Sequence, residues 1–291
     1  MNKHLLVTIS EDPSAHFGLR FVCAFFQNKE DVRLTLFNTA PLPPAVWAEE
    51  TSFETLRQSE VATEAIIKSG QLAMEAARSI FLQGGFSAGQ VDDKIVSRNF
   101  SRIQDIIKEG ETGLYDAVVF GRRGMLKLEN FMDKSASEEM LQEKFAFPLW
   151  LCRDVEYDRK GVLLCVDGSE PARRMADHVG FILQGEPEHP VTILRVLRQT
   201  DVKQNMEVGL FSEAIAALED NGLPSRLIKT RLEVSENVAQ AIIQEADRGR
   251  YAAVAVGRSD RHKGVLAQLV RGSVTMTMFR KLTGAALWVS R

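Results

Sequence analysis

The chain has 291 residues, of which 45% are hydrophobic and 26% charged, and its formal net charge is −3. These values are typical of a globular protein long enough for two domains, and they exclude a disordered, collagen-like or disulfide-dense chain. Such a small net charge gives no reason to expect a nucleic-acid partner, which requires a concentrated basic face.

The cysteines and the apolar runs indicate the compartment. Cys23, Cys152 and Cys165 show no paired spacing, which is typical of reduced, buried thiols. Residues 1–10 lack a basic leader with a long apolar core, and no apolar run approaches the roughly 18 residues that a membrane span needs. We therefore expect a soluble cytoplasmic protein with no membrane partner.

The first half alternates short apolar runs with amphipathic stretches. The run HLLVTIS at 4–10 predicts a buried strand, and a helix is expected from an N-cap at Ser14 to about Gln27. Helical periodicity then runs from about 53 to 82. The other elements expected here are strands at 32–39, 93–97, 115–120 and 147–153, and helices at 101–109 and 134–145.

The second half restarts the same alternation after the short charged segment 154–160, which we expect to be a linker. Strands are expected at 161–167, 191–196, 226–233, 251–256 and 285–290, and helices at 171–183, 204–221, 234–249 and 272–282. This order predicts an α/β protein with two tandem, doubly wound, parallel five-stranded sheets. The predicted domains are 1–153 and 161–291.

Matching positions in the two halves indicate a duplication. Asp167 lies 157 residues after Ser10, whereas Tyr251 lies 136 residues after Tyr115 and Trp288 lies 138 residues after Trp150. The falling offset places the extra residues of the first half between its second and fourth strands.

Each half ends in a strand that contains a tryptophan, in LWLCR and LWVSR. A terminal strand is a natural sheet edge, and exposed edges pair with other strands. We expect the two fifth strands to meet across a pseudo-twofold axis, so that the two halves form an intrachain pseudo-dimer, with Trp150 and Trp288 near the contact. The alternative is that each Trp fills only its own core. Association of two chains as a homodimer stays open.

A possible anion site follows the fourth strand of the second half. A buried strand ends at Gly257, and after a basic loop Gly272 and Ser273 open a helix. Glycines let a backbone approach a phosphate, and the first N–H groups of a helix lack intrahelical partners. The loop residues Arg258, Arg261, His262 and Lys263 either grip a phosphate by charge or form a solvated basic loop. No other His or Cys lies at ligand spacing from His262, so no metal site is expected.

These motifs resemble those of the universal stress protein family in its tandem two-domain form, over nearly the whole of both halves. In that family the first strand ends in an Asp that meets the adenosine part of ATP. Its fourth strand leads into G-x-x-G and, nine residues later, Gly-Ser/Thr, which hold the ribose and phosphates. The resemblance implies ATP or AMP as ligand, with Mg²⁺ only alongside ATP, in a stress-response sensor or regulatory module.

The second half keeps more of that family's motif. The binding residues that the resemblance implies there are Asp167, Gly168, Val196, Gly257, Arg258, Gly272, Ser273 and Val274. Two departures stand out. The interval from Gly257 to Gly272 is two residues longer than the family spacing, and the second glycine of G-x-x-G falls where this chain has Asp260 or His262.

The first half loses different positions. Gly121 to Gly124 form an intact G-x-x-G, but Lys134 and Ser135 stand where the family has Gly-Ser, and Ser10 stands in place of the Asp. Lys134 either supplies charge to a phosphate or occupies its place. The weaker candidates of this half are therefore Ser10, Gly121, Gly124 and Ser135.

The sequence shows no minimal catalytic motif. It has no G-x-S-x-G, H-E-x-x-H or P-loop pattern. A slow ATPase is the most that we expect of it as an enzyme, because no general base stands where a water could be held. The main hypothesis is nucleotide binding by the second domain. The alternative is a structural or interaction protein in which both pockets are vestigial and no nucleotide binds.

Overall fold

The structure is a computed structural model of the chain, and it describes residues 2–10, 16–40, 53–97, 101–121, 140–141, 143–153, 155–200, 209, 211–258 and 274–290. The chain divides into two compact units: Met1–Cys23 with Lys29–Phe145, and Ala24–Asn28 with Ala146–Arg291. Both are parallel α/β structures with strands and helices in alternation, so the predicted fold class is confirmed. The domain bounds 1–153 and 161–291 stay a prediction.

The first unit has a four-stranded parallel sheet in the order β3-β2-β1-β4. Its strands are β1 Lys3–Thr8, β2 Val32–Ala40, β3 Val91–Ser97 and β4 Ala117–Gly121. Its helices are α1 His16–Phe25, of which Ala24 and Phe25 belong to the second unit, α2 Phe53–Gln83 and α3 Arg102–Thr112, with short 3₁₀ turns at Lys29–Asp31 and Ala88–Gln90. Residues 5–8 of β1 and 117–120 of β4 are buried, as expected of strands that are covered on both faces.

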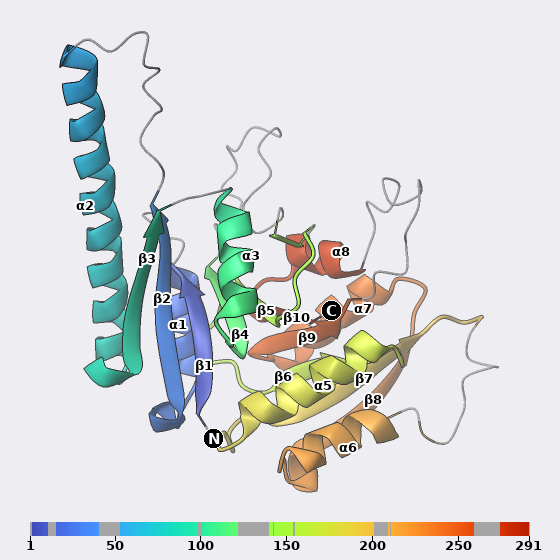
Figure 1. Cartoon of the computed structure of the whole chain (residues 1–291). Coiled ribbons are helices and arrows are strands. Elements are labelled where there is room, and N and C mark those ends of the chain that lie inside the picture. The colour runs from blue at the N-terminus through green and yellow to red at the C-terminus, as the bar shows by residue number, and fades with distance from the viewer. Residues whose placement is uncertain are drawn as a thin grey trace. The chain divides into compact units, whose positions relative to one another are not determined.

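Helix α2 is the longest element, and its extent agrees with the periodicity read from the sequence. Gly70, Met74, Ala77 and Phe81 are buried at spacings of three or four residues, which places one stripe of the helix against the sheet. Nearer its start, Ile67 is 48% exposed. Figure 1 shows that the N-terminal half of α2 extends past the ends of β2 and β3.

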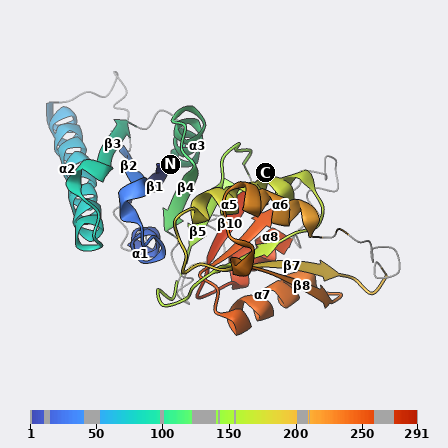
Figure 2. The same ribbon diagram turned by 90° about the horizontal axis from the view of Figure 1, so that it is seen from below.

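The second unit has a six-stranded sheet in the order β5-β10-β9-β6-β7-β8. Its strands are β5 Leu149–Cys152, β6 Val162–Cys165, β7 Val191–Leu197, β8 Ile228–Val234, β9 Ala253–Gly257 and β10 Ala286–Ser290. Its helices are α5 Glu170–Leu183, α6 Ser212–Asp220, α7 Val238–Gly249 and α8 Val274–Lys281, with a 3₁₀ turn at Ser225–Leu227. Figure 2 shows α5 and α6 on one face of this sheet and α7 on the other. The five strands of each predicted half are all present, but β5 clusters with the second unit.

Strands β5 and β10 pair antiparallel, while the other pairs of this sheet are parallel. Trp150 and Trp288 stand opposite each other in this pair, and both are fully buried. The prediction that the two fifth strands meet, with the tryptophans at the contact, is confirmed. The pseudo-twofold relation stays a prediction.

The third helix of each unit ends in the same way. Leu114 and Arg250, which lie 136 residues apart, both adopt a left-handed conformation, with φ of 53° and 48°. A left-handed residue is a common way to stop a helix. The tyrosine that follows each of them donates a hydrogen bond to a buried glutamate of the helix, from Tyr115 to Glu109 and from Tyr251 to Glu245. The same local structure therefore recurs in both units.

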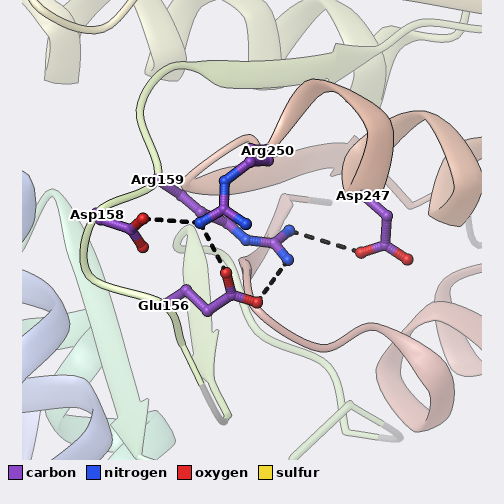
Figure 3. Close-up of polar contacts among 5 residues, drawn as sticks. All are labelled: Glu156, Asp158, Arg159, Asp247 and Arg250. Carbon is purple, nitrogen blue, oxygen red and sulfur yellow. Dashed lines mark hydrogen bonds and ion pairs between the residues drawn. The ribbon is translucent and has the colours of Figure 1, made fainter.

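The segment expected to be a linker packs into the second unit. Val155 forms a parallel bridge with Gly284. The Arg159 side chain is only 6% exposed and lies between Glu156, at 2.8 Å, and Asp247, at 3.6 Å (Figure 3). Arg250 contacts Glu156 and Asp158 at 2.9 and 2.7 Å. The charged residues of this segment, Glu156, Asp158 and Arg159, therefore form ion pairs within the second unit.

Several predicted boundaries need correction. The helix expected from 234 begins at Val238, because Val234 still pairs with Leu197 in the sheet and Asn237 caps the helix. Helix α6 begins at Ser212 rather than near 204, although 201–208 lie outside the described residues. Of the helix expected at 134–145, only 140–141 are described as helical; 143–145 are not helical, and the rest lies outside the described residues, as does Ser14.

Candidate functional site

The carboxyl end of β6 is a tight turn that leads into α5. Gly168 has φ of +80°, a conformation that glycine adopts without strain. The Asp167 carboxylate accepts a hydrogen bond from the Ser169 backbone N–H at 2.9 Å, and the Ser169 hydroxyl caps α5 by accepting from the Ala172 N–H at 3.4 Å. Asp167 is exposed, so the turn presents an acceptor at the end of a buried strand.

The end of β9 comes very close to the start of α5. A Cβ on Gly257 would lie 2.2 Å from the Ala172 nitrogen and 2.3 Å from the Pro171 carbonyl carbon, so only glycine fits there. The Ser290 hydroxyl donates to the Pro171 carbonyl at 3.0 Å, and the Arg258 N–H donates to the Ser290 carbonyl at 2.8 Å. The ends of β9 and β10 are thus joined to the first turn of α5.

These strand ends lie where the strand order reverses. Strand β6 has β7 on one side and β9 on the other. The chain leaves β6 through α5 and reaches β9 through α7, on opposite faces of the sheet. Ligands of open α/β sheets bind in the crevice that such a reversal leaves at the carboxyl ends of the strands. Asp167 and Gly257 flank this position.

The other predicted residues of the second half are partly described. Val196 lies near the end of β7 and is half-buried. Val274 is the half-buried first residue of α8, and Thr275 is buried. Gly272, Ser273 and the loop residues Arg261, His262 and Lys263 lie outside the described residues.

The corresponding end of β1 in the first unit is occupied by the unit's own side chains. The Ile9 carbonyl accepts hydrogen bonds from the Asn38 amide at 3.2 Å and from the Arg102 guanidinium at 3.1 Å. Ser10 follows and is half-buried, and Gly121 ends β4. Gly124, Lys134 and Ser135 lie outside the described residues.

Arg195 on β7 belongs to the site and was missed by the motif comparison. Among the described residues its buried Nε atom has no hydrogen-bond partner, and its Nη1 atom lies 3.5 Å from where a Cβ on Gly168 would stand. The feature of the sequence that could have identified Arg195 is an arginine within the apolar run VTILRVL. A basic residue on an otherwise apolar strand is informative because charges are seldom buried unless paired.

Two chemistries have little support here. Cys165 ends β6, but burial raises the pKa of its thiol, so it is a poor nucleophile. No group of three His, Cys, Asp or Glu residues suited to a metal ion occurs among the described residues.

In the same part of the chain, no helix is both long and apolar enough to cross a membrane.

Comparison with known proteins defines the fold. A universal stress protein from Archaeoglobus fulgidus DSM 4304 matches 99% of this chain and 98% of its own, with a TM-score of 0.71 and 13% identity. A functionally unknown protein from Pseudomonas aeruginosa PAO1 matches 99% of this chain and 92% of its own, with a TM-score of 0.55 and 12% identity. A universal stress protein in complex with cAMP covers 46% of this chain and 97% of its own at 18% identity, with a TM-score of only 0.38.

No protein-family model and no curated protein sequence matches the chain. The likeness is therefore one of structure. The protein has the universal stress protein fold, and its match to the Archaeoglobus protein extends over both units.

Proposed function

We propose that the second unit binds an adenine nucleotide, ATP or AMP, and that the protein acts as a sensor or regulatory module of a stress response. One observation carries the proposal: Asp167 and the sterically restricted Gly257 flank the reversal of strand order, at the carboxyl ends of β6 and β9. This is where an open α/β sheet leaves room for a ligand.

Each residue has a role in the proposed complex. The Asp167 carboxylate accepts hydrogen bonds from ribose hydroxyls, as an acidic residue does in dinucleotide folds. Val196 offers backbone groups to the base. The phosphates meet the backbone at Gly257 and the residues that open α8, while Gly168 lets the chain turn beside the ligand. The full proposed set is Asp167, Gly168, Val196, Gly257, Arg258, Gly272, Ser273 and Val274. Mg²⁺ accompanies the ligand only if it is ATP.

The first unit is assigned the weaker role. Asn38 and Arg102 already satisfy the Ile9 carbonyl, and Ser10 replaces the acidic residue. We place no primary site at Ser10, Gly121, Gly124 or Ser135. Domains at 1–153 and 161–291 and a cytoplasmic location form part of the same proposal. Ligand binding would shift the population of a loop conformation and so alter affinity for a partner.

The experiment is mass spectrometry of the small molecules that are released on denaturing protein purified without added nucleotide. Titration of ligand-free protein with ATP, AMP and cyclic nucleotides by calorimetry follows. An adenine nucleotide near one per chain supports a single site. No release and no binding at millimolar concentrations overturns the proposal, and it favours an interaction protein whose pockets are both vestigial.

A further inference from the structure

Arg195 is a cation without a described partner at the edge where the proposed ligand binds. It lies in β7, two residues before the strand ends, and it is only partly buried, so its outer nitrogens are within reach of a ligand. Its Nε atom is buried and makes no hydrogen bond. Among the described residues, the structure gives Arg195 neither a hydrogen bond nor an ion pair. A buried donor left without a partner costs stability, so no stabilising contact within the described residues explains this position, and the outer nitrogens are available to a ligand.

The carboxylates of the neighbouring elements make contacts of their own. The Asp167 carboxylate accepts from the Ser169 N–H, and Glu170 pairs with Arg173 and Arg174. Glu233 is in register with Val196, and side chains alternate between the faces of a strand, so Glu233 lies on the face opposite Arg195. There it pairs with Arg231 at 3.9 Å. None of these acidic groups forms an ion pair or a hydrogen bond with Arg195.

The first unit gives an internal comparison. Phe37 pairs with Thr8 in the same way as Leu194 pairs with Cys165, so the next residues, Asn38 and Arg195, occupy matching positions. The Asn38 amide is neutral, and it closes the end of β1 by donating to the Ile9 carbonyl. At the same position the second unit keeps a guanidinium whose Nε makes no such bond. The two units therefore differ by one positive charge at the end of the second strand.

We propose that Arg195 is an anion contact of the second unit, alongside the backbone at Gly257, and that it selects a ligand carrying a phosphate ester beside Asp167. This inference rests on the proposed nucleotide site, and it names the phosphate as the part of the ligand that Arg195 recognises. The carboxylate of Asp167 takes hydroxyl donors of the sugar, and the guanidinium takes the phosphate oxygens. Arginine suits this role because its planar fork of donors matches a phosphate in two places at once. An uncharged nucleoside has no phosphate, so it would leave the N–H donors of the Arg195 guanidinium without an acceptor.

The test compares the wild type with Arg195→Met and Arg195→Lys, using adenosine, AMP, ATP and inorganic pyrophosphate as probes in calorimetric titrations. Arg195→Met is expected to weaken AMP binding by roughly 10-fold to 100-fold, the range for a charge-assisted hydrogen bond, and to leave adenosine within about 2-fold. Arg195→Lys should recover part of the AMP affinity, since it keeps the charge and loses the fork.

A second readout uses protein without ligand. If Arg195 is kept for a ligand, Arg195→Met leaves the melting temperature unchanged or raises it, because an unmatched buried donor is removed. The matched control is Arg231→Met on the next strand, which removes ion pairs to Glu233 and Glu245 and should lower the melting temperature. A fall for Arg195→Met as large as that for Arg231→Met would show a structural role and overturn the proposal.

The outcomes separate the two proposals. Equal losses for AMP and adenosine, or no loss for either, overturn the role of Arg195 while nucleotide binding stands. Binding of pyrophosphate that depends on Arg195, without binding of adenosine, AMP or ATP, retains the anion contact and overturns the adenine nucleotide. No binding of any probe overturns both.

Discussion

The indole rings of Trp150 and Trp288 stack with their centroids 4.1 Å apart and only 7° between their planes. They face each other across the antiparallel pair of β5 and β10, and both are fully buried. The Trp150 N–H donates to the His178 ring at 3.0 Å, and the Phe25 ring packs edge-on against Trp288 at 5.2 Å. This cluster is the aromatic centre of the second unit.

Truncating either tryptophan should remove a large part of that centre. Trp150→Ala or Trp288→Ala is expected to lower the free energy of unfolding by about 3 to 5 kcal/mol, as is typical of a buried aromatic residue that leaves a cavity. Urea denaturation measures the change, and Tyr157→Ala, at a residue that is 40% exposed, should cost less than about 1 kcal/mol. Stacked indoles also couple in circular dichroism, and both single variants should abolish the same signal. A signal that survives either change would contradict the stacking.

Two buried histidines predict a pH dependence of stability. Burial lowers the pKa of His178 to about 3 and that of His189 to about 4, from an ordinary value of 6.5. His189 accepts from the Gly161 N–H and donates to the Phe25 carbonyl, each at 2.9 Å, which suits its neutral form. Because the folded values are depressed, the unfolded chain binds more protons below pH 6.5. Stability is therefore complete above about pH 6.5 and is lost as the pH falls.

The expected slope is about 1.4 kcal/mol per pH unit for each histidine between roughly pH 6 and pH 5. Urea denaturation at several pH values measures it. The control is the double variant His178→Gln and His189→Gln, whose amides still bond their neighbours and do not titrate. The same slope in the double variant would exclude the two histidines as its source.

The repeated tyrosine–glutamate pairs should contribute similarly in the two units. Tyr115 donates to Glu109 at 2.7 Å, and Tyr251 donates to Glu245 at 3.3 Å. Burial and the neighbouring carboxylate raise the pKa of both phenols. Tyr115→Phe and Tyr251→Phe should each lower the free energy of unfolding by about 1 kcal/mol, the usual net value of a hydrogen bond. Chemical denaturation measures each loss. A loss confined to one variant would contradict the equivalence of the two sites.

Gly284 and Gly222 form a matched pair for the packing of the segment around Arg159. Both have a left-handed backbone, with φ of +77° and +82°. A Cβ on Gly284 would lie 2.2 Å from the Arg159 guanidinium, whereas one on Gly222 would meet nothing within 4 Å. Gly222→Ala should cost about 1 to 2 kcal/mol from backbone strain alone. Gly284→Ala should cost clearly more, because it also displaces a buried arginine. Thermal unfolding of the two variants measures both losses of stability. Equal losses would mean that the Arg159 side chain moves aside at no cost.

Asp167 and Ser10 test which unit holds the nucleotide. Asp167→Ala should weaken nucleotide affinity by about 1 to 3 kcal/mol, because ribose hydroxyls lose their acceptor, whereas Ser10→Ala should have almost no effect. Calorimetric titration with AMP measures both. Asp167 is exposed, so the melting temperature should change little and a loss of binding would not reflect unfolding. Equal effects at the two positions would refute the assignment to the second unit.

Much of the fold could be predicted from the sequence, because strand and helix periodicities are local properties. The runs around β1, β2 and β9 and the long helix α2 agree with the structure to within a few residues. The start of α7 was predicted wrongly, because Val234 pairs with Leu197 and a pairing partner is not visible in local periodicity. Asp167 and Gly257 were identified by motif, and the structure brings both to the reversal of strand order.

The sequence by itself determined the alternation of strands and helices, the two halves, and the glycine and acidic residues that end their strands. Only the tertiary structure decided which charges are compensated. Arg159 lies in a segment that reads as a charged linker, and it is buried between the carboxylates of Glu156 and Asp247. Arg195 lies in an apolar strand without any described partner. The physical reason is that the energy of a charge depends on its neighbours in space, and the packing of distant segments decides which groups those neighbours are.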